Sequence, residues 1–204
     1  MLTIVHKLLD FIFPPRDTQL VVRGLSLETI LTLYHPGLHE TTHYLLPYQT
    51  DVVRSLIKEN KFHGNTHAAT LLAGILDRYL KEYVNQSVVV IPIPLSKLRK
   101  KTRGYNQVEQ ILQQLPPQTG VSIRADILSR AKDTPAQTTQ PKEARLKNMK
   151  NAFVANAPKD ITERCTVIII DDVVTTGATL RAAREAITPT LPSSTTIICL
   201  ALAH

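Results

Sequence analysis

Two adjacent acids followed by a threonine-rich loop are the residues of this chain best suited to chemistry. Asp171 and Asp172 come directly after five residues with mainly β-branched side chains, which predict a buried strand. A helix is predicted from Ala178 to Ile187, so the loop 175–179 (Thr-Thr-Gly-Ala-Thr) lies where a strand gives way to a helix. In open α/β sheets, ligands bind at that edge.

The residue types at this edge suit a sugar that carries a phosphate. Free N–H groups at the start of a helix bind phosphate, and Gly177 lets the anion approach closely. Asp171 and Asp172 would repel a phosphate, so their expected partners are sugar hydroxyls or a hydrated divalent cation. We expect both acids to face solvent. The alternative is an ordinary strand-to-helix turn with a threonine cap, which needs only one of these residues.

The string from Asp171 to Thr179 resembles the phosphoribosyl pyrophosphate motif of type I phosphoribosyltransferases. The resemblance implies that Asp171 and Asp172 are catalytic residues that hold the ribose hydroxyls and, indirectly, Mg²⁺. It also implies a loop that binds ribose and the 5′-phosphate, formed by Val173, Thr175, Thr176, Gly177, Ala178 and Thr179.

A second motif combines prolines with clustered cations. The predicted strand Ser87 to Ile91 runs into Pro92 and Pro94, and a basic stretch, 96–107, follows. Proline supplies no N–H and fixes its backbone, so we expect a stiff basic loop at the carboxyl end of a strand. Such a loop could hold a diphosphate, or it could be a basic surface connection.

Together these motifs resemble the ComF family of phosphoribosyltransferase-like proteins, which is associated with competence and DNA uptake. The resemblance covers roughly residues 45–204 and includes Ile91-Pro-Ile-Pro-Leu95 and Arg103-Gly-Tyr-Asn-Gln107. It implies a Mg²⁺-dependent protein that binds phosphoribosyl pyrophosphate or a nucleotide. An enzyme of this kind would displace pyrophosphate at the anomeric carbon of the ribose. The residues assigned to pyrophosphate are Pro94, Lys97, Lys101, Arg103, Arg130 and Arg145. Arg130 and Arg145 stand at the two ends of a loop that the resemblance predicts to be mobile and to close over the substrate.

The chain departs from this family at its N-terminus. Many relatives carry zinc-ribbon CxxC pairs, the first just after a string like Phe13-Pro-Pro-Arg16, but Asp17 and Leu20 stand in the places of that pair. The two cysteines of the chain, Cys165 and Cys199, are too few for a structural zinc site. We therefore expect no bound zinc, and an N-terminal segment held by apolar packing.

Composition is that of an ordinary soluble protein, with 43% hydrophobic and 20% charged residues among 204. The low number of cysteines fits a reducing cytoplasm. No apolar stretch is long enough for membrane insertion. The net charge of +7 favours a polyanion, so single-stranded DNA binding without catalysis is the rival function. The sequence leaves open the acceptor, the general base and whether the protein is a homodimer.

Alternating strands and helices predict an α/β type I phosphoribosyltransferase fold, with a mostly parallel twisted sheet and helices on both faces. Residues 1–60 are expected to form an N-terminal helix and a small cap, or hood, with mixed strand character from Glu28 to Leu46. Residues 61–204 are expected to form the core. Further helices are predicted at 49–60, 66–84, 105–115 and 141–150, and further strands at 121–124, near 153 and at 195–202.

Overall fold

The computed structural model describes residues 14–84, 86–117, 120–131, 152–158, 161 and 164–204. Its main sheet has six strands in the order β1-β2-β8-β7-β3-β4. All neighbouring strands are parallel except the β1–β2 hairpin. The strands are β1 (Gly37–His39), β2 (Thr42–Leu46), β3 (Ser87–Pro92), β4 (Val121–Ile123), β7 (Cys165–Val173) and β8 (Thr196–Ala203). The mostly parallel α/β sheet is thus confirmed.

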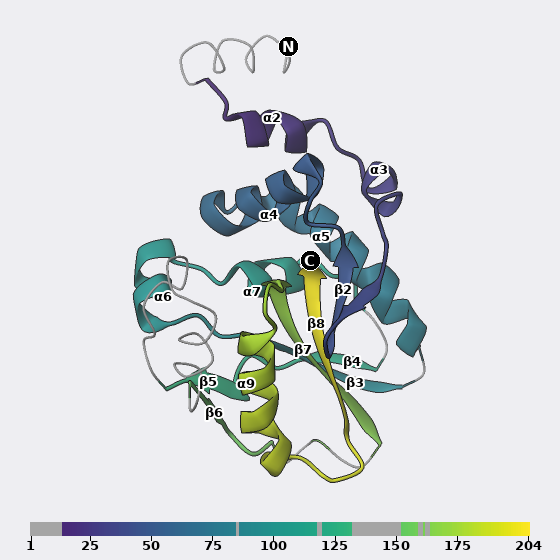
Figure 1. Cartoon of the computed structure of the whole chain (residues 1–204), viewed down its shortest axis with the longest axis vertical. Helices are drawn as coiled ribbons and strands as arrows, with labels where there is room; N and C mark the ends of the chain where they lie inside the picture. The colour runs from purple at the N-terminus through teal and green to yellow at the C-terminus, as the bar shows by residue number, and fades with distance from the viewer. Residues whose placement is uncertain (1–13, 85, 118–119, 132–151, 159–160, 162–163) are drawn as a thin grey trace.

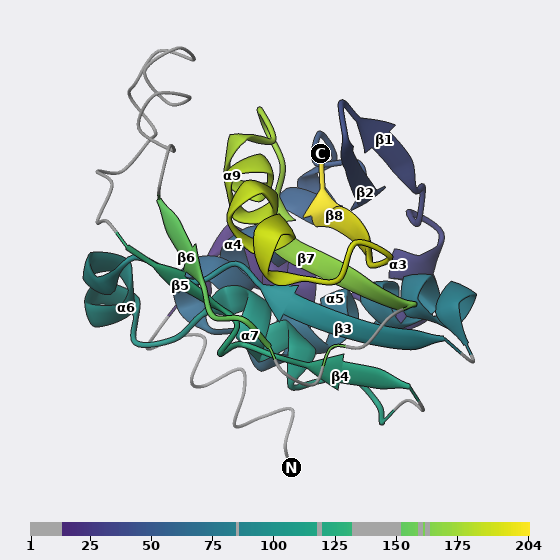
Figure 2. The same ribbon diagram turned by 90° about the horizontal axis from the view of Figure 1, so that it is seen from below.

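Both faces of this sheet are covered (Figures 1 and 2). On one face lie α4 (Asp51–His63), α5 (Thr66–Leu80) and α7 (Gln107–Leu112), which share a buried cluster with Ile168 and Ile170 of β7. On the other lie α9 (Ala178–Ile187) and a separate antiparallel pair, β5 (Leu128–Arg130) and β6 (Phe153–Ala155). This second cluster takes Val167 and Ile169. The side chains of β7 therefore alternate between two cores, as they must in a central strand.

Two short helices precede the first hairpin and lie over α4 and α5 (Figure 1). They are α2 (Asp17–Arg23) and α3 (Leu27–Leu31), and each buries one apolar side chain in the cluster beneath α4. Strand structure in this region begins only at β1, so the mixed strand character expected from residue 28 was wrong for its first part. The boundary expected at residue 60 stays a prediction, and the expected helix before Phe13 lies outside the described residues.

The stiff basic loop expected after β3 is instead a helix, α6 (Lys97–Arg103). Ser96 caps it, because its hydroxyl accepts a hydrogen bond from the N–H of Arg99. Gly104, with φ of 82°, ends it by donating its N–H to the carbonyl of Lys100. The prediction was wrong because it relied on the clustered cations and the nearby prolines. The N-cap signal of Ser96 and the C-cap signal of Gly104, which mark the two ends of the helix, were not used.

The other predicted elements are present with small shifts of their ends. The long helix expected to reach residue 84 ends as α5 at Leu80 and continues as a 3₁₀ turn, η1 (Lys81–Tyr83). The helix expected over 105–115 is the shorter α7, and a second 3₁₀ turn, η3 (Thr188–Thr190), follows α9. The predicted helix at 141–150 and nearly all of the loop before it lie outside the described residues.

The connections from β3 and β7 leave the sheet in opposite directions. From β7 the chain crosses through α9 to β8, whereas from β3 it passes through α6 and α7 to β4. The helices α9 and α7 cover opposite faces of the sheet. A crevice forms where such connections diverge at the carboxyl ends of parallel strands. The ends of β3 and β7 therefore mark the candidate site.

Candidate functional site

The two acids of the motif point to opposite faces of the sheet. Strand β7 continues through both, with Asp171 opposite Ala201 in β8. Successive side chains of a strand alternate, so Asp172 turns toward α4 and Asp171 toward the side of α9. Asp172 is only 4% exposed, and its Oδ2 lies 2.5 Å from Nζ of Lys61 on α4. The expectation that both acids face solvent was wrong for Asp172.

Backbone N–H groups orient both carboxylates. Asp172 donates its N–H to Oδ1 of Asp171 over 2.8 Å, and Val173 donates its N–H to Oδ1 of Asp172 over 2.9 Å. Burial and the charge of Asp172 raise the pKa of Asp171 to about 7, although Lys61 acts in the opposite direction. Asp171 therefore binds a proton readily near neutral pH. A ribose hydroxyl or a metal cation beside its carboxylate would favour release of this proton.

Lys61 is fixed by contacts between the end of α4 and the α6–α7 junction. The hydroxyl of Tyr105 donates to the carbonyls of Asn60 and Lys61 over 3.0 and 3.1 Å. The Asn60 amide donates to the carbonyl of Gln107 over 3.1 Å. These bonds hold the backbone that carries Lys61 beside the motif strand.

The expected phosphate loop leads from β7 into α9. Gly177 precedes the first helical residue, Ala178, and has φ of 63°, a left-handed conformation that favours glycine. The Arg181 guanidinium holds this loop, since its Nη2 donates to the Thr176 carbonyl over 3.0 Å and to Oε2 of Glu40 over 2.9 Å. The first turn of α9 thus presents N–H groups beside a glycine, as an anion site requires.

A cavity of about 380 Å³ joins these groups at the carboxyl ends of β3 and β7. It is lined from three sides: the end of α4, the segment from Ile93 into α6, and the motif. The polar and charged side chains that line it are Lys58, Lys61, Arg99, Gln107, Arg130, Asp171, Asp172, Thr175 and Thr179. Cations thus face the acids across one crevice, an arrangement suited to a sugar that carries several phosphates.

The residues predicted to hold pyrophosphate fall in different places. Pro94 and Arg130 line this cavity, whereas Lys97 lines a neighbouring one and Lys101 lines neither. Arg103 donates to Oε1 of Gln107 over 2.5 Å and lies 5.4 Å from the centre of the Phe62 ring. Burial lowers the pKa of Arg103.

Arg145 lies outside the described residues, and the pyrophosphate roles all stay predictions. Sequence reasoning did not assign Lys61 or Arg99 to the site, although both line the cavity. Arg99 lies within the basic stretch, so its cluster gave a signal. Lys61 falls in a segment that resembles the ComF family, but nothing in the sequence linked it to Asp172, which is 111 residues away in the chain.

The carboxylates are compatible with Mg²⁺. This ion is held by hard oxygen ligands, commonly one or two carboxylates together with phosphate oxygens of a substrate. Asp171 and Asp172 supply carboxylate oxygens at the cavity. Among the described residues, no group of three or more His, Cys, Asp or Glu side chains could hold a metal by itself. Both cysteines are buried and free, and the absence of zinc stays a prediction.

Comparisons with known proteins identify the family to which the chain belongs. Residues 60–204 match the family model of the phosphoribosyl transferase domain. Competence protein F of Haemophilus influenzae is 30% identical over 138 residues, which cover 68% of this chain and 60% of that protein. Competence protein ComFC of Bacillus subtilis is 26% identical over 138 residues (65% and 52%), and DNA utilization protein YhgH of Salmonella typhi is 28% identical over 130 residues (61% and 56%).

Among solved structures, a hypoxanthine phosphoribosyltransferase from Staphylococcus aureus is similar with a TM-score of 0.39 and 17% identity, over 66% of this chain and 63% of that chain. The family match and the sheet order confirm the phosphoribosyltransferase fold. The chain belongs to the phosphoribosyltransferase domain family and, within it, to the ComF and YhgH group. The matched segments span 52–60% of the three relatives' own lengths. No helix in the described part of the chain has the length and apolar character needed to cross a membrane.

Proposed function

We propose that the cavity binds phosphoribosyl pyrophosphate or a nucleotide, and that the protein acts in the cytoplasm. The observation that supports this most is the Asp171–Asp172 pair at the end of β7, directly before the Gly177 turn and the start of α9. In this arrangement the acids accept hydrogen bonds from the ribose hydroxyls, while the first turn of α9 holds the 5′-phosphate. The roles of Val173, Thr175, Thr176, Ala178 and Thr179 belong to the same proposal.

As a phosphoribosyltransferase, the protein would stabilise charge that develops as pyrophosphate leaves the anomeric carbon. Lys61 and Arg99 line the cavity and offset the charge of the leaving group, together with Arg130. Bound Mg²⁺ would supply a further positive charge at the phosphate oxygens. Tyr48 of the N-terminal segment and Phe62 of α4 line the cavity, so we expect the acceptor to be selected there.

The test is calorimetric titration of phosphoribosyl pyrophosphate with and without Mg²⁺. We expect saturable binding that Mg²⁺ strengthens, and at least a tenfold loss of affinity in Asp171→Asn. The matched control is Glu185→Gln, which removes an acid from the exposed face of α9 outside the cavity. Equal affinity in Asp171→Asn and the control would exclude a ribose role for this acid.

A second candidate function is the binding of single-stranded DNA without catalysis. Helix α6 carries five cations, Lys97, Arg99, Lys100, Lys101 and Arg103, and two of the relatives are named for competence and one for DNA utilization. Binding through phosphates would weaken steeply with salt, with a log–log slope of about 0.7 per phosphate neutralised. A salt-independent affinity for single strands, or none at all, would count against this function.

A further inference from the structure

The turn of the β1–β2 hairpin contains a strained residue. Glu40 lies between the two strands with φ of 52°, a left-handed conformation that residues other than glycine rarely adopt. Glycine or asparagine would fit this turn with less strain. Strain of this kind is found mostly where the side chain has a function. The contacts of the Glu40 carboxylate are therefore informative.

Glu40 is joined to the loop proposed to bind the 5′-phosphate. Its Oε2 accepts a hydrogen bond from Nη2 of Arg181 over 2.9 Å, and the same Nη2 donates to the Thr176 carbonyl over 3.0 Å. A terminal guanidinium nitrogen carries two N–H groups, so both are used. Because both charged side chains are partly exposed, the ion pair contributes little to stability. Its effect is to orient Arg181 on the loop carbonyl.

A second contact joins the hairpin to the same loop. Nδ1 of His204 donates to the Val174 carbonyl over 3.2 Å. The His204 ring stacks on the His39 ring with 3.9 Å between the ring centres, and the Tyr44 ring lies 5.2 Å from it. His39 belongs to β1 and Tyr44 to β2, so the hairpin holds this imidazole in place.

These contacts occupy carbonyls of the loop and leave its N–H groups free. Within the described part of the chain, no N–H group of residues 175–180 donates to a protein acceptor. In a trans peptide unit, the C=O of one residue and the N–H of the next point in opposite directions. With the Val174 and Thr176 carbonyls held, the N–H groups of Thr175 and Gly177 point away from His204 and Arg181. Both residues line a small hollow at the start of α9, where an anion can accept these bonds.

We propose that the β1–β2 hairpin positions the phosphate loop, with Glu40 acting through Arg181 and His39 acting through His204. This inference rests on the proposed binding of phosphoribosyl pyrophosphate or a nucleotide at this loop. All four are positioning residues, because they hold the loop through its carbonyls and not through the ligand. Their loss weakens ligands that carry a 5′-phosphate.

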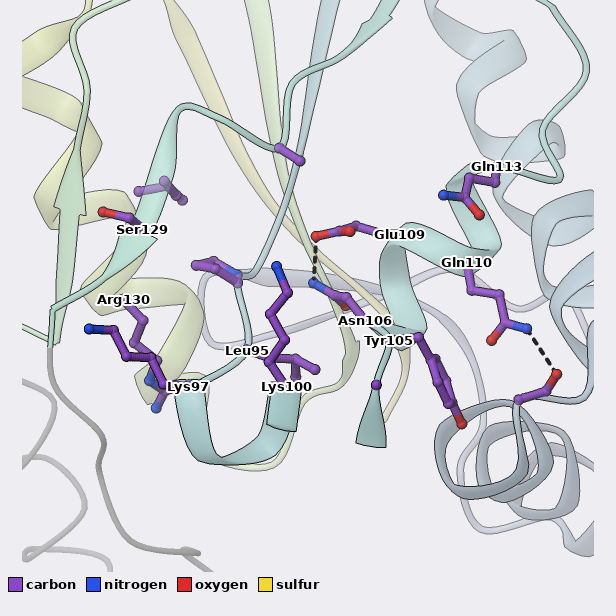
Figure 3. Close-up of a pocket in the computed structure, with 15 residues that line it drawn as sticks. Leu95, Lys97, Lys100, Tyr105, Asn106, Glu109, Gln110, Gln113, Ser129 and Arg130 are labelled. Carbon is purple, nitrogen blue, oxygen red and sulfur yellow. Dashed lines mark hydrogen bonds between the residues drawn. The ribbon is translucent and has the colours of Figure 1, made fainter. Parts of the chain in front are cut away.

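The end of the cavity proposed for pyrophosphate is built by other elements. It is lined by Arg99 of α6 and Arg130 of β5. Figure 3 shows the side chain of Arg130 extending from β5 toward α6. Neither contact from the hairpin includes a residue of α6 or β5. Pyrophosphate, which has no 5′-phosphate, should therefore bind independently of the hairpin.

The test is calorimetric titration of the whole chain with ribose 5-phosphate, and with inorganic pyrophosphate and Mg²⁺. Glu40→Gln and Glu40→Ala remove the same charge and keep a Cβ atom in the strained turn. Only glutamine retains an oxygen that accepts from Arg181. We expect Glu40→Ala to bind ribose 5-phosphate about fivefold more weakly than Glu40→Gln, the effect of one hydrogen bond. Both variants should bind pyrophosphate equally, and their Tm values should agree.

Arg181→Met tests whether Glu40 acts through Arg181. In the Arg181→Met background, Glu40→Ala should weaken ribose 5-phosphate no further. Arg184→Met is the matched control, because it removes an exposed cation from the same helix without a contact to the loop. It should change the affinity less than twofold. His39→Ala should weaken ribose 5-phosphate and leave pyrophosphate unchanged.

Three results would overturn the inference: equal affinity of Glu40→Ala and Glu40→Gln for ribose 5-phosphate, additive losses in the double variant, or an equal loss of pyrophosphate affinity. The proposed function would survive them if the wild type binds ribose 5-phosphate and Asp171→Asn weakens that binding. A wild type that binds no ribose 5-phosphate would overturn both.

Discussion

The ammonium group of Lys61 lies 2.5 Å from Oδ2 of Asp172 and joins the end of α4 to the end of the motif strand. Their side chains are 26% and 5% exposed, so the acid is almost fully buried and its charge is balanced mainly by this one cation. The pair therefore has two roles in the same place. It joins α4 to the sheet, and it keeps a cation in the lining of the cavity.

Removal of this cation should destabilise the protein. Lys61→Met leaves the Asp172 carboxylate buried without its ion-pair partner, which we expect to lower the free energy of unfolding by about 1–3 kcal/mol. The double variant with Asp172→Asn should recover part of this loss, because the unpaired charge is gone. Urea unfolding of the single and double variants measures the coupling. Lys58→Met, an exposed lysine one turn earlier, is the control; additive effects of Lys61→Met and Asp172→Asn would contradict the prediction.

The acid on the other face should behave differently. The pKa of Asp171 is raised to about 7 by burial and by Asp172, above its value of about 4 in an unfolded chain. The protonated form of Asp171 therefore favours the folded state. This stabilisation is complete below about pH 4 and is lost as the pH rises through 7. Asp171→Asn should raise Tm at pH 8 by about 2–4 °C, and should have no such effect at pH 4. Calorimetric scans at both pH values test this, and a lower Tm at pH 8 would contradict it.

Local patterns predicted the strand and helix around these acids, but not how the acids are shared between faces. The sequence indicated that the strand ends before Asp171; in the structure the sheet ladder continues to Val173, and alternation then separates the two side chains. On α6, Arg99 lines the cavity at the acids, whereas Lys97 and Lys100 line a neighbouring cavity. Because this segment was expected to be a loop, the sequence did not indicate that its cations would lie on different faces of a helix. Lys61 reaches Asp172 only through the packing of α4 on the sheet. Hydrophobic periodicity predicts which face of α4 is buried, but it does not predict which polar side chains this packing brings into contact.

The conformation of Gly177 allows a prediction with a matched control. A Cβ atom there would lie 3.5 Å from Oγ1 of Thr42, an ordinary contact, so the penalty of Gly177→Ala comes from its φ of 63°. We expect a loss of about 1–2 kcal/mol in stability together with weaker phosphate binding. Gly104→Ala meets the same penalty at φ of 82°, with no atom within 4 Å. Calorimetry should show that only Gly177→Ala loses affinity for phosphoribosyl pyrophosphate; equal losses would assign the effect to general destabilisation.

The absence of cysteine before Cys165 predicts that zinc has no structural role. Treatment with a chelator should leave Tm unchanged, and elemental analysis of the purified protein should show less than one zinc per chain. One tightly held equivalent, lost together with stability, would contradict this and make the histidines at positions 6, 35, 39 and 43 candidate ligands. Mg²⁺ with phosphoribosyl pyrophosphate should in contrast raise Tm, because a ligand that binds only the folded state stabilises it.

Acid should loosen α2 from α4 through Glu59. This fully buried carboxylate accepts hydrogen bonds from Arg16, Thr18 and Asn65. Burial alone would raise its pKa, but the bonds from Arg16 and its other partners outweigh burial and lower the pKa to about 2. Because the folded pKa lies below the unfolded value of about 4.3, the stability from this group is full above that value and is lost as pH falls toward 2.

Glu59→Gln should therefore lower the free energy of unfolding at pH 7 by about 1–3 kcal/mol, since a neutral amide cannot replace the bonds that the carboxylate accepts. Between pH 5 and pH 2.5 its stability should fall less steeply than that of the wild type. Asp51→Asn is the control, because that carboxylate pairs with Arg54 at the surface and is 89% exposed. Denaturant unfolding across this pH range provides the measurement. Parallel pH profiles for wild type and Glu59→Gln would show that another group, and not the Arg16–Glu59 contact, governs the loss of stability in acid.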